Sequence, residues 1–93
     1  MLNPLISIII PLYNMENSVK VTIDSLLDQD TDELYEVIVI NDGSTDNTLE
    51  IVQSAFDTSE FTNYKVINKT NGGVSSARNR GILEATGIYI IFL

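Results

Sequence analysis

The sequence predicts an α/β protein, an open and mostly parallel sheet with helices on both faces in the order β-α-β-α-β-α-β. Two observations predict this fold class. Four short runs rich in β-branched and aromatic residues are apolar almost throughout, which is typical of strands covered on both faces. Three segments with apolar residues at helical spacing lie between them. This alternation favours right-handed crossovers between parallel strands.

The four strands are expected over residues 5–10 (LISIII), 35–40 (YEVIVI), 64–67 (YKVI) and 88–93 (IYIIFL). Such short runs suit a small sheet, and 93 residues make one domain at most. The last run is expected to be a central strand. Because natural domains seldom end inside a central strand, we expect these residues to be part of a longer domain.

Three helices are expected between the strands. Their apolar stripes are Val19, Ile23, Leu26 and Leu27 in a helix of about residues 17–29, then Leu49, Val52 and Phe56, and last Val74, Ala77, Gly81 and Ala85. The small residues of the third stripe predict a helix that lies close to the sheet. Gly87 is expected at the C-cap of that helix, just before the last strand.

Composition and charge exclude several classes of function. A net charge of −8 with only five Lys or Arg argues against nucleic-acid binding. The sequence has no Cys and no His, so any metal would be a hard ion such as Mg²⁺ or Mn²⁺ on carboxylates, carbonyls or phosphates. No run approaches the roughly 20 apolar residues of a membrane span. We therefore expect a cytoplasmic chain without a membrane segment.

Polar segments follow the first three predicted strands, where an open α/β sheet binds ligands. They are PLYNMEN (11–17), NDGSTDNT (41–48) and NKTNGGVSSARNRG (68–81). Asp42 precedes the residues expected to cap the second helix, in which Asn47 and Glu50 have the spacing of a capping box. Asp42 therefore has no necessary structural task, and its carboxylate can accept a hydrogen bond from a ligand such as the imide edge of uracil.

The other two segments allow both a ligand-binding and a structural interpretation. Tyr13 can stack on a base and Asn14 can bond to it, but a Pro-initiated turn explains both residues equally well. Ser75 and Ser76 are expected to cap the third helix. Arg78 lies near the start of that helix, where a cation opposes the helix dipole, so a diphosphate partner is favoured for it. Arg80 is expected to be a solvated surface residue.

Together, ISIIIPLYN, VIVINDGSTDNT and NGGVSSARNRGILEATGIYIIFL resemble the N-terminal half of a family-2 glycosyltransferase of the GT-A fold, in the family's order and approximate spacing. The resemblance implies that residues 1–93 are the nucleotide-sugar-binding half of such a domain, with a UDP-sugar as the favoured donor. It implies that Asp42 binds uracil. The other residues implied are Pro11, Tyr13, Asn14 and Glu16 beside the uridine, Gly43 and Ser44 beside Asp42, and Gly73, Ala77, Arg78 and Asn79 along the nucleotide and diphosphate.

The resemblance also carries expectations for a longer parent protein. In the family, a D-x-D motif that holds Mg²⁺ or Mn²⁺ follows a strand like the last one here, and a general-base Asp lies farther on. We therefore expect the parent to transfer a sugar with inversion to a saccharide or lipid-linked acceptor in cell-wall or capsule assembly, where attachment to the inner membrane face would depend on later residues. The 93 residues end before these groups and are expected to be inactive alone. One departure is Asn41, where the family often has a second Asp.

Two alternatives belong to other classes of protein. A non-catalytic module would use the exposed edge of the last strand to pair with a second copy of the chain or with another partner, since an unpaired strand edge favours association. A receiver-like phosphoacceptor domain would need an acidic cluster after the first strand, and Pro11, Leu12 and Tyr13 stand there instead. The glycine pattern also matches neither GxGxxG nor a P-loop.

Overall fold

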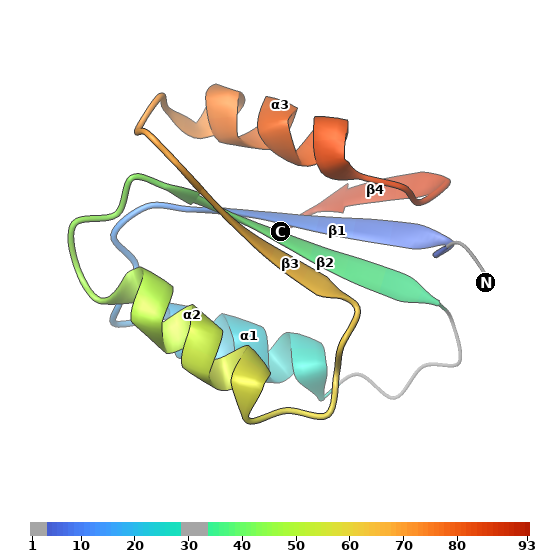
Figure 1. The fold of residues 1–93 in the computed structure, drawn as a ribbon, viewed down its shortest axis with the longest axis horizontal. Helices are drawn as coiled ribbons and strands as arrows, with labels where there is room; N and C mark the ends of the chain where they lie inside the picture. The colour runs from blue at the N-terminus through green and yellow to red at the C-terminus, as the bar shows by residue number, and fades with distance from the viewer. Residues whose placement is uncertain (1–3, 29–33) are drawn as a thin grey trace.

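The computed structural model describes residues 4–28 and 34–93, which form the predicted alternation of strands and helices (Figure 1). The elements are β1 (Ile6–Leu12), α1 (Val19–Leu27), β2 (Tyr35–Asp42), α2 (Thr48–Asp57), β3 (Tyr64–Lys69), α3 (Val74–Glu84) and β4 (Tyr89–Phe92). The predicted fold class is confirmed. The predicted end of the first helix, residue 29, lies outside the described residues.

The four strands form one parallel sheet in the order β3-β2-β1-β4. Helices α1 and α2 cover one face of the sheet, and α3 covers the other (Figure 1). Among the described residues β4 pairs only with β1 and is therefore an edge strand of this sheet. The expectation of a central strand concerns a longer domain, and it stays a prediction.

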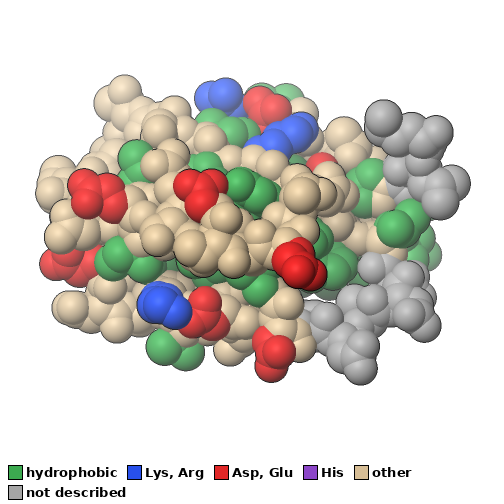
Figure 2. Space-filling view, turned by 60° about the horizontal axis from the view of Figure 1, so that its bottom comes forward, with side chains coloured by type: hydrophobic (Ala, Val, Ile, Leu, Met, Phe, Trp, Pro, Cys, Tyr) green, Lys and Arg blue, Asp and Glu red, His purple; other side chains and the backbone are tan. Residues whose placement is uncertain are grey.

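Alternate residues of β1 and β2 point to opposite faces, so the sheet divides the core in two. Ile10 and Val39 pack with residues of α1 and α2, including Ile23 and Phe56. On the other face, Ile9, Ile38 and Ile40 pack against Ala77 of α3. The face that carries α1 and α2 has acidic side chains spread among polar and hydrophobic ones (Figure 2), in keeping with the negative net charge.

Helix α3 lies close to the sheet, as its small residues predicted. A Cβ on Gly81 would come within 2.3 Å of Cγ2 of Ile9, which is fully buried. The predicted stripe is only partly right, because Val74 is 53% exposed. Ala85 packs against the core but follows the helix in extended conformation.

Gly87 does not cap α3, contrary to the prediction, because the helix ends at Glu84 and Ala85 is its C-cap. The glycine is instead required by a close approach to β1. A Cβ at this position would lie 2.7 Å from Oγ and 2.8 Å from the backbone nitrogen of Ser7. The connection from α3 to β4 therefore runs so close to β1 that only glycine, which has no Cβ, fits at position 87.

A buried polar cluster holds this connection in place at the N-terminal ends of the strands. Glu36 accepts hydrogen bonds from Oγ of Ser7 (2.6 Å) and from the backbone N–H (2.7 Å) and hydroxyl (2.9 Å) of Thr86. The N–H of Gly87 donates to Oγ of Ser7. Burial would raise the pKa of Glu36, but these hydrogen bonds and the charge of Lys65 hold it below its ordinary value.

Candidate functional site

The C-terminal ends of the strands form the candidate site. Strands β1, β2 and β3 each run two residues beyond the predicted end, so Asp42 is the last residue of β2. A cavity of about 260 Å³ opens there, between the loop after β1 and the start of α3. It is lined by Pro11, Tyr13, Asp42, Asn71, Gly73, Val74 and Ala77.

The lining includes five of the predicted residues and adds two that the sequence motifs did not mark for binding, Asn71 and Val74. Tyr13 is half exposed at the mouth of this cavity. Pro11 is paired in register with Ile40 of β2, and it lies two residues beyond Ile9, the last residue of β1 that pairs with β4.

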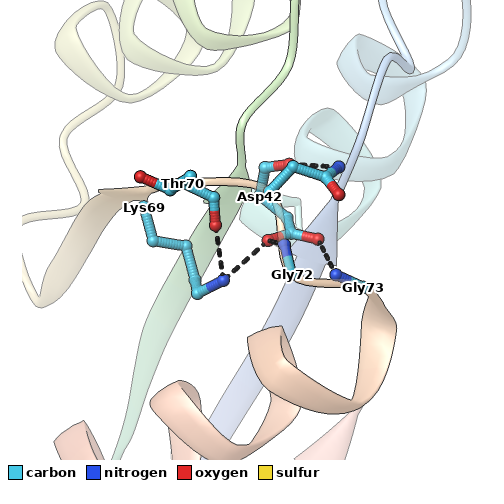
Figure 3. A network of polar contacts seen from close by, with 6 residues as sticks. Asp42, Lys69, Thr70, Gly72 and Gly73 are labelled. Carbon is cyan, nitrogen blue, oxygen red and sulfur yellow. Dashed lines mark hydrogen bonds and ion pairs between the residues drawn. The ribbon is translucent and has the colours of Figure 1, made fainter.

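Asp42 is the centre of a polar network between β2, β3 and α3 (Figure 3). Its Oδ1 accepts hydrogen bonds from Nζ of Lys69 (2.8 Å) and from the N–H of Gly72 (2.9 Å), and its Oδ2 accepts one from the N–H of Gly73 (2.9 Å). Nζ of Lys69 also donates to the carbonyl of Thr70. The side chain of Asp42 is 4% exposed, so nearly all of its carboxylate is enclosed.

The charge state of Asp42 follows from these contacts. The hydrogen bond from Lys69 is the largest cause that holds the pKa of the carboxyl below its ordinary value. Burial opposes this shift, while the two glycine amides and the positive charge of Lys69 add to it. The cavity therefore presents an ionised carboxylate at neutral pH.

The prediction that Asp42 has no structural task is wrong. Its side chain fixes the loop between β3 and α3 through Gly72 and Gly73, and the side-chain amide of Asn71 donates to its backbone carbonyl at 3.0 Å. The sequence could not show this, because the contacts join residues 27 to 31 positions apart. They arise from the register of β2 and β3, which pairs Asp42 with Lys69.

Two glycines of the site have the left-handed backbone conformation that favours glycine. Gly43 has φ +74°, and a Cβ on it would lie 2.7 Å from the backbone nitrogen of Asn71. Gly73 has φ +92° and is the N-cap residue of α3. The predicted capping by Ser75 or Ser76 is not observed, since the N-cap residue is Gly73 and both serines lie within the helix.

Asn14, Glu16 and Ser44 do not line the cavity but join the loops after β1 and β2. Oδ1 of Asn14 accepts from the N–H of Thr45 (2.8 Å), and the N–H of Asn14 donates to Oγ of Ser44 (3.0 Å). Oε2 of Glu16 accepts from the N–H of Asn47 (3.1 Å). Asn14 has φ +48°, which makes it the one described non-glycine residue with positive φ. These residues position the loop that carries Tyr13.

Asp46 completes this junction at the start of α2. Its Oδ1 accepts from the N–H (2.9 Å) and the hydroxyl of Thr48, and its Oδ2 accepts from the N–H of Glu16 (3.2 Å). Burial tends to raise the pKa of Asp46, but these hydrogen bonds outweigh it, so the net shift is downward. The predicted capping box of Asn47 and Glu50 is wrong, because the side chain of Asn47 makes no capping hydrogen bond.

The remaining predicted residues lie on α3. Ala77 is buried at the cavity wall, whereas Asn79 is exposed. Arg78 is the fifth residue of the helix, and its guanidinium carbon lies 5.7 Å from the centre of the Phe92 ring at the end of β4. Arg80 lies at the surface with its side chain 42% exposed, and its Nε pairs with Glu84 at 3.2 Å.

Residues 4–28 and 34–93 hold neither a cluster of metal ligands nor a membrane span. Nowhere in these residues do three acidic side chains gather closely enough to hold a metal ion. None of the helices in the same ranges has the length and apolar character needed to cross a membrane.

Comparison with known proteins links this fold and site to one family. The family model described as "Glycosyl transferase family 2" matches residues 7–93. An uncharacterized glycosyltransferase EpsJ of Bacillus subtilis is 44% identical over 90 residues, which are 97% of this chain and 25% of that protein. Chondroitin synthase of Pasteurella multocida is 42% identical over 87 residues, 94% of this chain and 9% of that protein.

Solved structures with similar folds carry nucleotide sugars. S. aureus TarS 1-349 in complex with UDP-GlcNAc has a TM-score of 0.82 and 35% identity, covering 95% of this chain and 25% of that one. The mannosyltransferase PcManGT from Pyrobaculum calidifontis, in complex with GDP-Man and Mn²⁺, has a TM-score of 0.82 and 26% identity. The match covers 92% of this chain and 26% of that one. The chain thus spans about a quarter or less of the length of EpsJ, chondroitin synthase, TarS 1-349 and PcManGT.

Proposed function

This chain belongs to glycosyl transferase family 2, and from that premise we propose that its residues 1–93 are the nucleotide-sugar-binding part of a sugar-transferring enzyme. The single observation that carries the proposal is the position of Asp42. An enclosed, ionised carboxylate lines a cavity at the C-terminal ends of β1 and β2, which is where an open α/β sheet binds its ligands.

The proposed ligand of Asp42 is the uracil ring of a UDP-sugar. A carboxylate accepts hydrogen bonds only, and the imide edge of uracil offers one N–H between two carbonyls. Tyr13 lines the same cavity and is half exposed, so its ring is available to stack on the base. The UDP-GlcNAc complex of TarS supports uracil, whereas the GDP-Man complex of PcManGT makes guanine the main competitor.

The diphosphate is proposed to lie at the start of α3. Gly73 leaves open space where a Cβ would be, and the first turn of the helix presents backbone N–H groups with a positive dipole end. Arg78 is exposed on the same helix, and a guanidinium pairs well with phosphate oxygens. The guanidinium carbon of Arg78 lies 5.7 Å from the centre of the Phe92 ring. Asn79 is proposed as a weaker polar contact nearby.

The longer protein is proposed to transfer the sugar with inversion to a saccharide or lipid-linked acceptor. Chondroitin synthase, which matches over 94% of this chain, supports a polysaccharide product. The Mg²⁺ or Mn²⁺ expected for the family would assist departure of the diphosphate, and its ligands are proposed to come from other residues of the longer protein. The 93 residues alone are proposed to bind nucleotide weakly and to transfer no sugar.

The proposal is tested by calorimetric titration of the chain with UDP and with 3-methyl-UDP. The methyl group removes the imide N–H without any change to the protein, so we expect binding at least about tenfold weaker if Asp42 accepts that hydrogen bond. Asp42→Ala should abolish UDP binding, while Asp57→Ala, which removes the same charge from the end of α2, should not. Equal binding of both ligands by the folded chain would refute the role of Asp42.

A second candidate function, self-association through β4, is favoured by one observation. Residues 88–93 form a continuous apolar segment along the edge strand, with every residue between 40% and 76% exposed. Such an edge offers unpaired backbone groups together with hydrophobic surface. A second copy of the chain is the proposed partner, with the two β4 strands side by side.

Sedimentation velocity over a wide range of concentrations tests this second function. The expected result is a dimer that dissociates on dilution and that Ile90→Lys prevents, since a charge on an edge strand opposes pairing. A monomer at every concentration would refute it.

A further inference from the structure

The hydrogen bonds that Asp42 already accepts limit what a ligand can donate to it. A carboxylate has about four acceptor positions on its two oxygens. Among the described residues, Lys69 and Gly72 donate to Oδ1, and Gly73 donates to Oδ2. Oδ1 is therefore fully used, and Oδ2 keeps one position. Since Asp42 lines the cavity, this remaining position is the one that a ligand can reach.

Lys69 is firmly held on Oδ1. It is paired in register with Asp42 at the ends of the adjacent strands β3 and β2, so the backbone brings the two side chains together. Its Nζ donates both to Oδ1 (2.8 Å) and to the carbonyl of Thr70 (2.7 Å), and its side chain is only 16% exposed. Figure 3 shows this ammonium between its two acceptors, on the side of the carboxylate away from Gly73.

Bases differ in the number of N–H groups that their edges present. Uracil has one imide N–H, flanked by carbonyls that only accept. Guanine has a ring N–H beside an exocyclic amino group, and this pair of donors needs both oxygens of a carboxylate. A carboxylate with one open position satisfies uracil fully and leaves one donor of guanine without a partner, which is unfavourable in a buried site.

We propose that Lys69 is a specificity-determining residue, which selects uracil over guanine by occupying Oδ1 of Asp42 and leaving a single acceptor position open. This inference rests on the proposed nucleotide site and adds the choice of base to it. Neither strand alone carries this property, which depends on the paired ends of β2 and β3.

The test compares GDP with IDP, because the two ligands differ only in the exocyclic amino group that Lys69 is proposed to exclude. For the wild-type chain, GDP should bind no more tightly than IDP, and UDP should bind more tightly than either. Lys69→Met opens Oδ1, so GDP should then bind about tenfold more tightly than IDP, the effect of one hydrogen bond to a charged acceptor. Lys69→Gln keeps an N–H donor and should restore the wild-type ratio.

Lys65→Met is the matched control. It removes the same charge from the same strand, but its Nζ contacts the carbonyl of Glu84 at 3.5 Å and not Asp42. The ratio of GDP to IDP affinity should therefore stay at the wild-type value. A general loss of structure would weaken the binding of UDP, GDP and IDP together and would not change the ratio of GDP to IDP affinity.

Two outcomes would overturn the inference while the proposed function stands. One is that the wild-type chain binds GDP about tenfold more tightly than it binds IDP. This outcome can be measured without any variant. The other is UDP binding by Lys69→Met with a GDP to IDP ratio unchanged from wild type. If the folded wild-type chain binds none of the three nucleotides at saturating concentrations, the proposed function fails, and the inference fails with it.

Discussion

The side-chain oxygen of Asn14 accepts a hydrogen bond from the backbone N–H of Thr45, 31 residues farther along the chain, at 2.8 Å. This contact joins the loop after β1 to the loop after β2, and the N–H of Asn14 donates back to Ser44. Tyr13 stands directly before this junction. The loop that carries Tyr13 is therefore fixed by its contacts with the loop after β2. Two of the residues that make these contacts, Asn14 and Ser44, were expected from the sequence to contact the ligand.

Asn14→Ala should lower the free energy of unfolding by about 1–2 kcal/mol, because it removes the acceptor for Thr45 and forces alanine into a positive φ. Asn14→Gly should recover the backbone part of this loss, and Asn14→Asp should recover the acceptor. Urea unfolding of the three variants measures both parts. Wild-type stability of Asn14→Ala would contradict the proposed role of the junction.

Tyr13→Ala should weaken UDP binding by about tenfold, since stacking of a base on an aromatic ring contributes ~1–3 kcal/mol. Tyr13→Phe keeps the ring and should bind UDP almost as the wild type does. Tyr89→Ala removes another exposed tyrosine from the start of β4, at the opposite end of the strands, and serves as the control. Titration of each variant with UDP distinguishes stacking from a general effect of losing a tyrosine.

Gly81→Ala should destabilise the protein by about 1–3 kcal/mol, although alanine is normally the better residue in the middle of a helix. The added Cβ would lie 2.3 Å from Cγ2 of the fully buried Ile9, so α3 must move away from the sheet. Ser75→Ala, at an exposed position of the same helix, should change stability by less than about 0.5 kcal/mol. Thermal unfolding that shows a more stable Gly81→Ala would disprove the close approach.

Glu36→Gln should lower stability by about 2 kcal/mol at neutral pH, because the charge-assisted hydrogen bonds from Ser7 and Thr86 are lost. The folded-state pKa of Glu36 lies below its ordinary value of 4.5, so its ionised form stabilises the fold above that pH. This contribution disappears as the pH falls through the lower folded-state pKa.

The pH dependence of unfolding checks the assignment to Glu36. Between about pH 5 and pH 3, the wild type should lose more stability than Glu36→Gln. The variant should still lose some, because the pKa values of Asp42 and Asp46 are also lowered in the folded state. Parallel curves for the two proteins would contradict a role of Glu36 in acid unfolding.

The sequence by itself determined the order of strands and helices, the edge of the sheet that carries the site, and the close contact of α3 with the sheet. Each of these depends on a local pattern, since apolar periodicity reports which face of an element is buried. Asp42 was found in the same way, because strand ends are marked by the change from apolar to polar residues, whereas Gly73 and Ala77 of the cavity wall were implied as site residues only by the family resemblance.

Only the tertiary structure decided which residues share contacts across the loops. These contacts join residues 27 to 80 positions apart. They are the pairing of Asp42 with Lys69, the hydrogen bonds of Asn14 and Glu16, and the approach of Gly87 to Ser7. They depend on the register of parallel strands and on the path of the crossovers between them. No periodicity within one segment contains that information, because each partner is brought into place by a different strand.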